Sequence, residues 1–337
     1  MPRLETLSPQ GRLLLAVAER IGTEVAGPVA DDVDRAGRFP SEAVGALRAE
    51  GLLAALVPKS HGGGDCSYAD ISALCTELGK HCSSSAMIFA MHQIQVSCVL
   101  EHGGATPYFD ALLRDIGETG RLLASATSEV GIGGDVRSSV CAVEQDGDRF
   151  SLAKAAPVIS YGEYVDDVLV TARRSPEAPA NDQVLVHVQK PNLTLAPTGV
   201  WDTIGMRGTC SIGFDLRATG SMGQVIPAPY SEISSQTMVP VSHITWASLW
   251  LGIAENAVGK AHTFVRAAAR KTPGSLPQSA HHLASVVGLL ESIRASVDHA
   301  VALFERARAQ GAVETSMSFA ISMNNLKVNV STAVFEV

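Results

Sequence analysis

The sequence predicts a multi-domain α+β protein in which a helical domain, a small β domain and a second set of helices follow one another along the chain. Three observations support this prediction. Apolar residues recur at helical spacing before residue 120, short runs in the middle alternate apolar and polar residues, and long helical periodicity returns after residue 238. We therefore expect an all-α domain at 1–120, a β domain at 121–232 and a C-terminal helical bundle at 233–337.

The composition indicates a soluble globular protein. A chain of 337 residues with 46% hydrophobic content can bury large cores and divide into two or three compact units. No apolar run approaches the roughly 20 residues that span a bilayer, and the N-terminus lacks a signal-peptide pattern, so we expect a cytoplasmic protein without a membrane span. The net charge of −8 argues against a nucleic-acid groove. The six cysteines show no C-x-x-C pair and no zinc spacing, which predicts reduced core thiols and no metal site.

The N-terminal domain carries helix signals from its start. Ser8 precedes apolar residues at helical spacing and is a suitable N-cap, and a second helical segment follows Pro40. Helical patterning resumes from Tyr68 to Leu78. We expect Ser83-Ser84-Ser85 to interrupt it, because serine is a poor helix-interior residue, before a helix from Met87 to Leu100.

The middle of the chain has strand patterns broken by turn residues. Ser139-Val140-Cys141-Ala142-Val143 and Val184-Leu185-Val186-His187-Val188 both alternate. The Asp146-Gly147 step predicts a hairpin turn, because glycine accepts a positive φ without a Cβ clash.

Three long helices are predicted after the strands. The first covers 238–269 with a broad apolar face and ends at Lys271-Thr272-Pro273-Gly274, since proline removes a hydrogen-bond donor. The second runs from Leu283 to Phe304 and precedes Gly311. The third begins near Ser316 and reaches Val337 with no capping signal, so we expect the sequence to be cut inside a helix.

Short segments in order along the chain resemble signatures of the acyl-CoA dehydrogenase family. Thr127-Ser128-Glu129 with Gly131-Ile132-Gly133-Gly134-Asp135 is similar to its Thr-Glu-Pro-x-Ala-Gly-Ser-Asp signature, and Trp201 to Thr209 resembles its second signature. Arg270-Lys271-Thr272-Pro273-Gly274 resembles its Arg-x-x-Phe-Gly motif. The usual N-terminal pattern is matched by Phe39-Pro40, Gly51-Leu52-Leu53, Val57-Pro58 and Gly62-Gly63-Gly64.

The resemblance implies a central β-barrel between helical domains, with FAD bound between barrel and bundle. It also implies a homodimer or homotetramer that dehydrogenates an acyl-CoA or acyl-carrier thioester at its α and β carbons. Hydride would pass to flavin N5, and the electrons would leave through an electron-transfer flavoprotein. Two alternatives stay open: a two-component flavin monooxygenase on the same scaffold, and a degenerate paralogue that has lost its catalytic base.

The resemblance also implies cofactor contacts. Ser128 and Ser160 match the two hydroxyl residues that hydrogen-bond the flavin ring, and Val158 replaces an aromatic residue that often covers it. Arg270 matches an arginine that reaches across a subunit interface to the FAD pyrophosphate, although a solvated arginine at a helix end is the alternative. The remaining cofactor candidates are Thr127, Gly133, Thr272 and His281.

The family's catalytic base is a glutamate, at one of two positions. The first falls near Ser242-His243, where this chain has no carboxylate, and the second would lie beyond Val337. Glu255 is on the same helix but more than three turns too late. Histidines manage protons in related monooxygenases, so His92 and His243 are weak catalytic candidates, with a packing role as the alternative for His92. The substrate-binding candidates are Gly134, Ser242 and His243.

Overall fold

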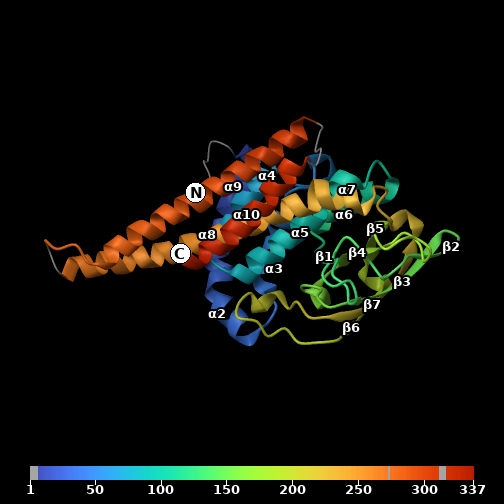
Figure 1. The fold of residues 1–337 in the computed structure, drawn as a ribbon, viewed down its shortest axis with the longest axis horizontal. Coiled ribbons are helices and arrows are strands. Elements are labelled where there is room, and N and C mark those ends of the chain that lie inside the picture. The colour runs from blue at the N-terminus through green and yellow to red at the C-terminus, as the bar shows by residue number, and fades with distance from the viewer. Residues whose placement is uncertain (1–6, 272–273, 311–315) are drawn as a thin grey trace.

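The computed structural model describes residues 7–271, 274–310 and 316–337. Helices form an elongated body, two β-sheets lie together beside it, and a long helical hairpin projects from the opposite end (Figure 1). Within the described ranges, no helix combines the length and apolar content that would let it cross a membrane.

Between residue 7 and the first strand, the structure has six α-helices. Ser8 caps the first of them as predicted, because its Oγ accepts the Gly11 N–H at 2.8 Å. The serines at 83–85 do not interrupt a helix but open one, since a first turn tolerates serine where backbone N–H groups lack intrahelical partners. These helices are α1 (Pro9–Ile21), α2 (Gly27–Ala36), α3 (Ser41–Ala49), α4 (Tyr68–Gly79), α5 (Ser83–His102) and α6 (Pro107–Thr119).

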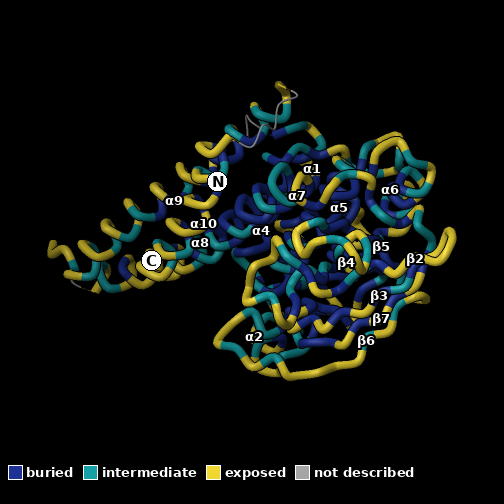
Figure 2. The backbone as a smooth tube through the Cα atoms, turned by 45° about the vertical axis from the view of Figure 1, so that its right-hand side comes forward, coloured by how far each residue is buried: buried dark blue, intermediate teal, exposed yellow. Residues whose placement is uncertain are grey.

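The helices predicted after the strands are present. A short helix, α7 (Tyr230–Ile233), leads through a π-helical turn at Ser234–Met238 into α8 (Val239–Lys271), which is followed by α9 (Ser279–Ala309) and α10 (Met317–Glu336). The predicted stop signals Pro273 and Gly311 lie outside the described residues. The outer part of the α8–α9 hairpin is largely exposed (Figure 2).

The strands form two open sheets, and the expected closed barrel is not confirmed. The first sheet has the order β1 (Leu123–Ala126), β4 (Asp167–Arg173) and β5 (Gln183–Gln189), with β1 parallel to β4. The second is antiparallel, with the order β2 (Glu144–Asp146), β3 (Arg149–Ala156), β7 (Phe214–Ser221) and β6 (Leu193–Pro197).

Two local strand predictions had opposite outcomes. The hairpin turn is confirmed: Gly147 has φ 56° between β2 and β3. The strand predicted at Ser139–Val143 is wrong, because that segment makes only an isolated bridge between Ala142 and Arg173. The carboxylate of Glu129 accepts the N–H groups of Val140 and Cys141, so these donors are not available to a neighbouring strand.

Helices α4 and α8 approach closely enough that two glycines are required. A Cβ on Gly252 would lie 2.0 Å from the carbonyl oxygen of Thr76, and one on Gly79 would lie 2.4 Å from that of Leu249. Both distances are far inside van der Waals contact. The crossing therefore fixes the first half of α8 against the N-terminal helices.

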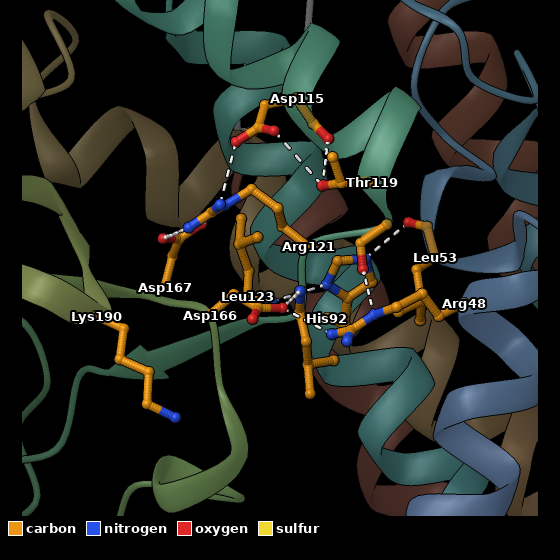
Figure 3. Close-up of polar contacts among 12 residues, drawn as sticks. Arg48, Leu53, His92, Asp115, Thr119, Arg121, Leu123, Asp166, Asp167 and Lys190 are labelled. Atoms are coloured by element: carbon orange, nitrogen blue, oxygen red, sulfur yellow. Dashed lines mark hydrogen bonds and ion pairs between the residues drawn. The ribbon is translucent and has the colours of Figure 1, made fainter.

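A polar cluster with the buried Asp167 at its centre, formed by Arg48, Arg121, Asp166 and Asp167, joins the first sheet to the helices (Figure 3). Arg121 donates to both carboxylate oxygens of the fully buried Asp167 at 2.6 Å each. Arg48 donates to Asp166 at 2.7 Å, and the same carboxylate accepts the Leu122 N–H at 2.8 Å. The start of β4 is thereby fixed to the start of β1.

The glycine crossing gives a matched pair of substitutions on one helix. We expect Gly252→Ala to lower the free energy of unfolding by about 2–3 kcal/mol, because the methyl group meets rigid backbone. Gly259→Ala, where an added Cβ meets nothing within 4 Å, should raise it by about 0.5–1 kcal/mol. Urea denaturation of the two variants measures both effects, and similar values for the two would contradict the close approach.

Candidate functional site

The two hydroxyl residues predicted to contact a cofactor lie where the two sheets meet. Ser128 follows β1 in the first sheet and Ser160 follows β3 in the second. The Ser128 hydroxyl donates to the Val158 carbonyl at 3.1 Å, and the Val158 side chain is 38% exposed. An apolar surface therefore lies beside hydroxyl groups from both sheets.

Ser160 is connected to the second signature segment through a row of buried hydroxyl groups. The Ser211 Oγ lies 2.8 Å from the Ser160 Oγ and 2.7 Å from the Thr209 Oγ1, which lies 2.9 Å from the Met206 carbonyl. The three hydroxyl residues are 3–7% exposed. The link was not visible in the sequence, because about 50 residues separate Ser160 from Ser211.

Glu129 closes the glycine-containing loop that follows Ser128. Its carboxylate accepts the Ser139 hydroxyl at 2.6 Å and the Cys141 N–H at 2.6 Å, and it lies 3.4 Å from the Lys154 ammonium. Burial lowers the pKa of Lys154. The Lys154 ammonium also donates to the Thr171 carbonyl and hydroxyl at 2.8 Å each, so the buried pair is well hydrogen-bonded.

The loop itself depends on glycine for its shape. Gly131, Gly133 and Gly134 have φ values of 97°, 60° and 86°, a region that other residues adopt at a steric penalty. An added Cβ on Gly133 or Gly134 would meet nothing within 4 Å, so open space rather than packed protein lies above them. The backbone of this loop can therefore approach a ligand closely.

A cavity of about 300 Å³ lies between this loop, the β4–β5 connection and the segment leading into α8. Gln183, at the start of β5, lines it with a side chain that is 3% exposed. Its Nε2 has no hydrogen-bond partner among the described residues. A buried amide without a partner is unfavourable by itself and can donate to an oxygen of a ligand in the cavity. The other lining residues are Arg137, Asn181, Tyr230, Ser231, Ser234 and Ser235.

None of these cavity residues was predicted from the sequence. A single glutamine at a strand end and three serines near a short helix are ordinary in any globular protein. One structural feature that marks this region as a candidate functional site is the π-helical turn Ser234–Met238, because such turns are frequent at functional sites. The cavity becomes visible only when the β4–β5 connection and this turn are brought together.

His92 has the contacts of a packing residue. It is fully buried, its Nε2 donates to the Leu53 carbonyl at 2.7 Å, and its Nδ1 accepts the Leu123 N–H at 3.1 Å (Figure 3). Burial lowers the pKa of His92 to about 4. Both ring nitrogens of the neutral imidazole are thus engaged with the backbone, and the ring joins α5 to β1.

Ser242 and His243 lie at the start of α8 but are not among the residues that line the cavity. The Ser242 hydroxyl donates to the Val239 carbonyl at 2.8 Å. The His243 Nδ1 donates to the Met323 carbonyl of α10 at 3.0 Å, and burial lowers the pKa of this histidine. In this conformation both side chains are directed to the backbone.

Arg270 lies at the opposite end of α8 from Ser242. Arg270 and His281 are exposed residues near the outer end of the α8–α9 hairpin, and Thr272 lies outside the described residues. A helix rises about 1.5 Å per residue, so Arg270 lies about 40 Å from Ser242. Glu255 forms an ion pair with Arg294 at 2.8 Å and with Lys80 at 3.3 Å, as a structural carboxylate does.

Among the described residues, no group of three or more His, Cys, Asp or Glu side chains is arranged to hold a metal ion. The site offers hydroxyl and amide donors around an open glycine loop. Such donors orient a ligand and stabilise negative charge.

Comparison with known proteins shows similarity to acyl-CoA dehydrogenases. The family model for the acyl-CoA dehydrogenase N-terminal domain matches residues 8–107. A cyclohex-1-ene-1-carbonyl-CoA dehydrogenase of Geobacter metallireducens is 26% identical over 207 residues, which are 61% of this chain and 54% of that protein. The chain thus spans about half the length of this curated relative.

Solved structures extend the similarity over nearly the whole chain. Butyryl-CoA dehydrogenase from Megasphaera elsdenii has a TM-score of 0.78 at 17% identity, covering 97% of this chain and 85% of that one. Methanesulfinate monooxygenase from Pseudomonas fluorescens has a TM-score of 0.81 at 20% identity, covering 98% and 84%. At these identities the similarity shows the acyl-CoA dehydrogenase fold alone. One of these two proteins is named a dehydrogenase and the other a monooxygenase, so the fold hosts two kinds of chemistry.

The depressed pKa of His92 gives a pH dependence of stability. His92 takes up a proton near pH 6.5 in the unfolded chain but only near pH 4 in the folded chain. The contribution of the neutral, buried His92 to the free energy of unfolding is therefore complete above about pH 6.5 and is lost as the pH falls toward 4. We expect the free energy of unfolding to fall over this window by about 3 kcal/mol more than in His92→Gln. Urea denaturation across the window measures it.

The exposed His262 provides the control for this titration. His262→Gln should follow the wild-type pH profile, because it removes an exposed histidine and leaves the buried His92 in place. Parallel profiles for His92→Gln and the wild type would show that burial of His92 does not set the acid limit of stability.

Proposed function

We propose, from the similarity of this chain to the acyl-CoA dehydrogenase family, that it is a flavin-dependent oxidoreductase that dehydrogenates an acyl thioester. The observation that carries the proposal is the unpartnered Gln183 amide in a cavity beside the glycine loop that follows Ser128. A flavin site and an adjacent site for a polar substrate arm are the two elements that such a reaction requires.

The residues at the junction of the sheets fit a flavin, and FAD is the form we propose. Ser128 and Ser160 provide hydroxyl groups on either side of the exposed, apolar Val158, a combination that suits a flat ring with polar edges. Thr127 and Gly133 lie on the same connection as Ser128 and provide further contacts to the proposed flavin. When bound, the flavin supplies a two-electron acceptor, and the donors of the chain stabilise the charge that accumulates on it.

The cavity fits the oxygen-rich arm of a thioester. The Gln183 Nε2 can donate to an amide or phosphate oxygen, and the three serine hydroxyl groups near α7 surround it with further polar partners. Arg137 lines the same cavity, and its guanidinium suits an anionic group. Gly134, which has no side chain, leaves space beside the glycine loop for the thioester arm. We propose acyl-CoA or an acyl-carrier thioester as substrate and an electron-transfer flavoprotein as electron acceptor.

One observation favours a second candidate function, oxygenation by a reduced flavin. No carboxylate is among the described residues that line the cavity, and Ser242 and His243, at the position of one family base, are bonded to the backbone. Removal of a thioester α-proton needs a positioned base, whereas oxygenation does not need a carboxylate there. The two candidates therefore differ in one measurable step.

We expect acyl-CoA esters to bleach the oxidised flavin absorbance of the flavin-loaded protein under anaerobic conditions. In Gln183→Met, which keeps the volume but removes the amide, the ester Kd should rise about tenfold because one ligand hydrogen bond is lost. Stability should stay unchanged or rise slightly, since the deleted donor has no partner in the free protein. Ester titrations and denaturation measure the two effects.

The exposed Gln145 on β2 is the matched control, and Gln145→Met should bind esters as the wild type does. Loss of stability in Gln183→Met without loss of affinity would assign this glutamine a structural role. Absence of bleaching by every ester, combined with oxygen transfer to an added substrate by the reduced protein, would select the oxygenase.

The position of Arg270 supports a homo-oligomer, either a dimer or a tetramer. About 40 Å of helix separates it from the start of α8, so one chain cannot bring Arg270 and its own flavin hydroxyl groups together through α8. We propose that the hairpin delivers Arg270, with Thr272 and His281 nearby, to the cofactor of a second copy. The exposed Phe264 and Leu276 provide apolar surface for that contact.

We expect Arg270→Ala to weaken FAD binding about tenfold or more, because a guanidinium–phosphate pair is lost, with little change in stability. Arg266→Ala, an exposed arginine one turn earlier on the same helix, is the control and should retain FAD. Flavin titration and sedimentation velocity test the proposal together. Equal FAD affinity in both variants, or a monomer that binds FAD as tightly as the wild type, would refute it.

A further inference from the structure

Strand β3 carries a lysine where the alternation of the strand calls for an apolar side chain. Leu152 and Ala156, two residues before and two residues after Lys154, are buried, and Lys154 lies on the same side of the strand with only 2% of its surface exposed. A lysine is almost never buried so deeply unless it is paired. The partners of Lys154 therefore indicate what this lysine does.

The Lys154 ammonium has partners on two other elements. It donates to the carbonyl and the hydroxyl of Thr171 on β4 at 2.8 Å each, and it lies 3.4 Å from the Glu129 carboxylate. The Thr171 hydroxyl in turn donates to the Thr127 carbonyl at 3.4 Å. One side chain of the second sheet is thus bound to β4 in the first sheet and to the segment that follows β1.

Glu129 holds the two ends of the glycine loop, residues 130–138, together. Its carboxylate accepts three donors that follow the loop, namely the Ser139 hydroxyl at 2.6 Å and the N–H groups of Val140 at 3.2 Å and Cys141 at 2.6 Å. A loop that contains three glycines gains much backbone entropy when it opens. The bonds to this one carboxylate must outweigh that entropy for the loop to stay closed.

The carboxylate depends on the ammonium for compensation of its charge. The side chain of Glu129 is 3% exposed and that of Lys154 is fully buried. Removal of one partner from a buried ion pair leaves an uncompensated charge, which is strongly unfavourable. Without Lys154, Glu129 would take up a proton and become a weaker acceptor, or it would turn toward water and release its three donors. Either response opens the glycine loop.

We propose that Lys154 is a positioning residue that keeps the glycine loop closed through Glu129 and thereby presents Arg137 to the ligand of the cavity that contains Gln183. The ligand in this statement rests on the function proposed above. Arg137 belongs to the loop and lines the cavity, whereas Lys154 is not among the described residues that line it. A loop that is already ordered spares the ligand the entropy of ordering it, so closure raises the affinity.

Removal of the ammonium should therefore open the loop and weaken binding. In Lys154→Met, we expect the amide hydrogens of Val140 and Cys141 to exchange with solvent about tenfold faster, because their acceptor is lost. The Kd of free CoA, which carries the polar arm without an acyl group, should rise about tenfold. Hydrogen-exchange mass spectrometry and calorimetry on the flavin-loaded protein measure the two effects.

Two further sites separate positioning of the loop from a general loss of stability. Lys80→Met removes a partly buried lysine that pairs with Glu77 at 2.6 Å on α4. This control should lose stability without faster exchange at Val140 and Cys141 and without weaker CoA binding. Thr171→Ser keeps both acceptors of the ammonium and should match the wild type, whereas Thr171→Val removes one acceptor and should raise the exchange rate about threefold.

Faster exchange together with weaker CoA binding, in Lys154→Met but not in Lys80→Met, is the expected result. Equal exchange in these two variants overturns the proposal, and so does faster exchange with an unchanged Kd for CoA. If Lys154→Met does not fold, wild-type exchange in Thr171→Val overturns the proposal instead. Failure of the wild type to bind CoA overturns the proposed ligand of the cavity, and the exchange comparison then still decides whether Lys154 holds the loop.

Discussion

The pairing of Asp167 with Arg121 is the interaction on which the geometry of the site depends. Burial alone would raise the pKa of Asp167, but the hydrogen bonds from Arg121, with the His187 Nε2 3.4 Å away, outweigh it and hold the pKa below its ordinary value. His187 in turn accepts the Tyr108 hydroxyl from α6 at 2.7 Å. A charged carboxylate without these partners would be strongly unfavourable in this position. The first sheet is therefore held in one orientation against the helices, and the glycine loop after β1 and Gln183 on β5 move with it.

The same constraint explains why the site is built from strand ends. β1 and β4 are parallel neighbours, so their carboxyl ends lie at one edge, and there the chain leaves β1 for Ser128. The second sheet supplies Ser160 at the end of β3, joined to Ser128 through the Val158 carbonyl. Two rigid sheets thus position hydroxyl groups that lie on short connecting segments. Loops held in this way combine backbone freedom with fixed geometry, as ligand sites require.

The sequence was sufficient for the helices but not for the contacts between distant segments. Periodicity located α8, α9 and α10 because their apolar stripes extend over many turns, and the glycine of the β2–β3 turn is a purely local signal. The strand expected at 139–143 failed because a carboxylate from residue 129 takes its N–H groups, a tertiary effect that alternation does not encode. Ser160 was recognised by resemblance, whereas Ser211 and Gln183 gained meaning only from neighbours that folding brought to them.

The distinction between dehydrogenation and oxygenation must lie in the residues around the substrate and not in the fold. Both chemistries are found on this fold, so the architecture cannot distinguish them. The two reactions differ in what they require around the substrate. Dehydrogenation of a thioester needs a pocket for its long polar arm and a base at its α-carbon. The cavity with Gln183 is the place that we propose for this arm, so the decisive feature of this protein is whether a carboxylate reaches that cavity.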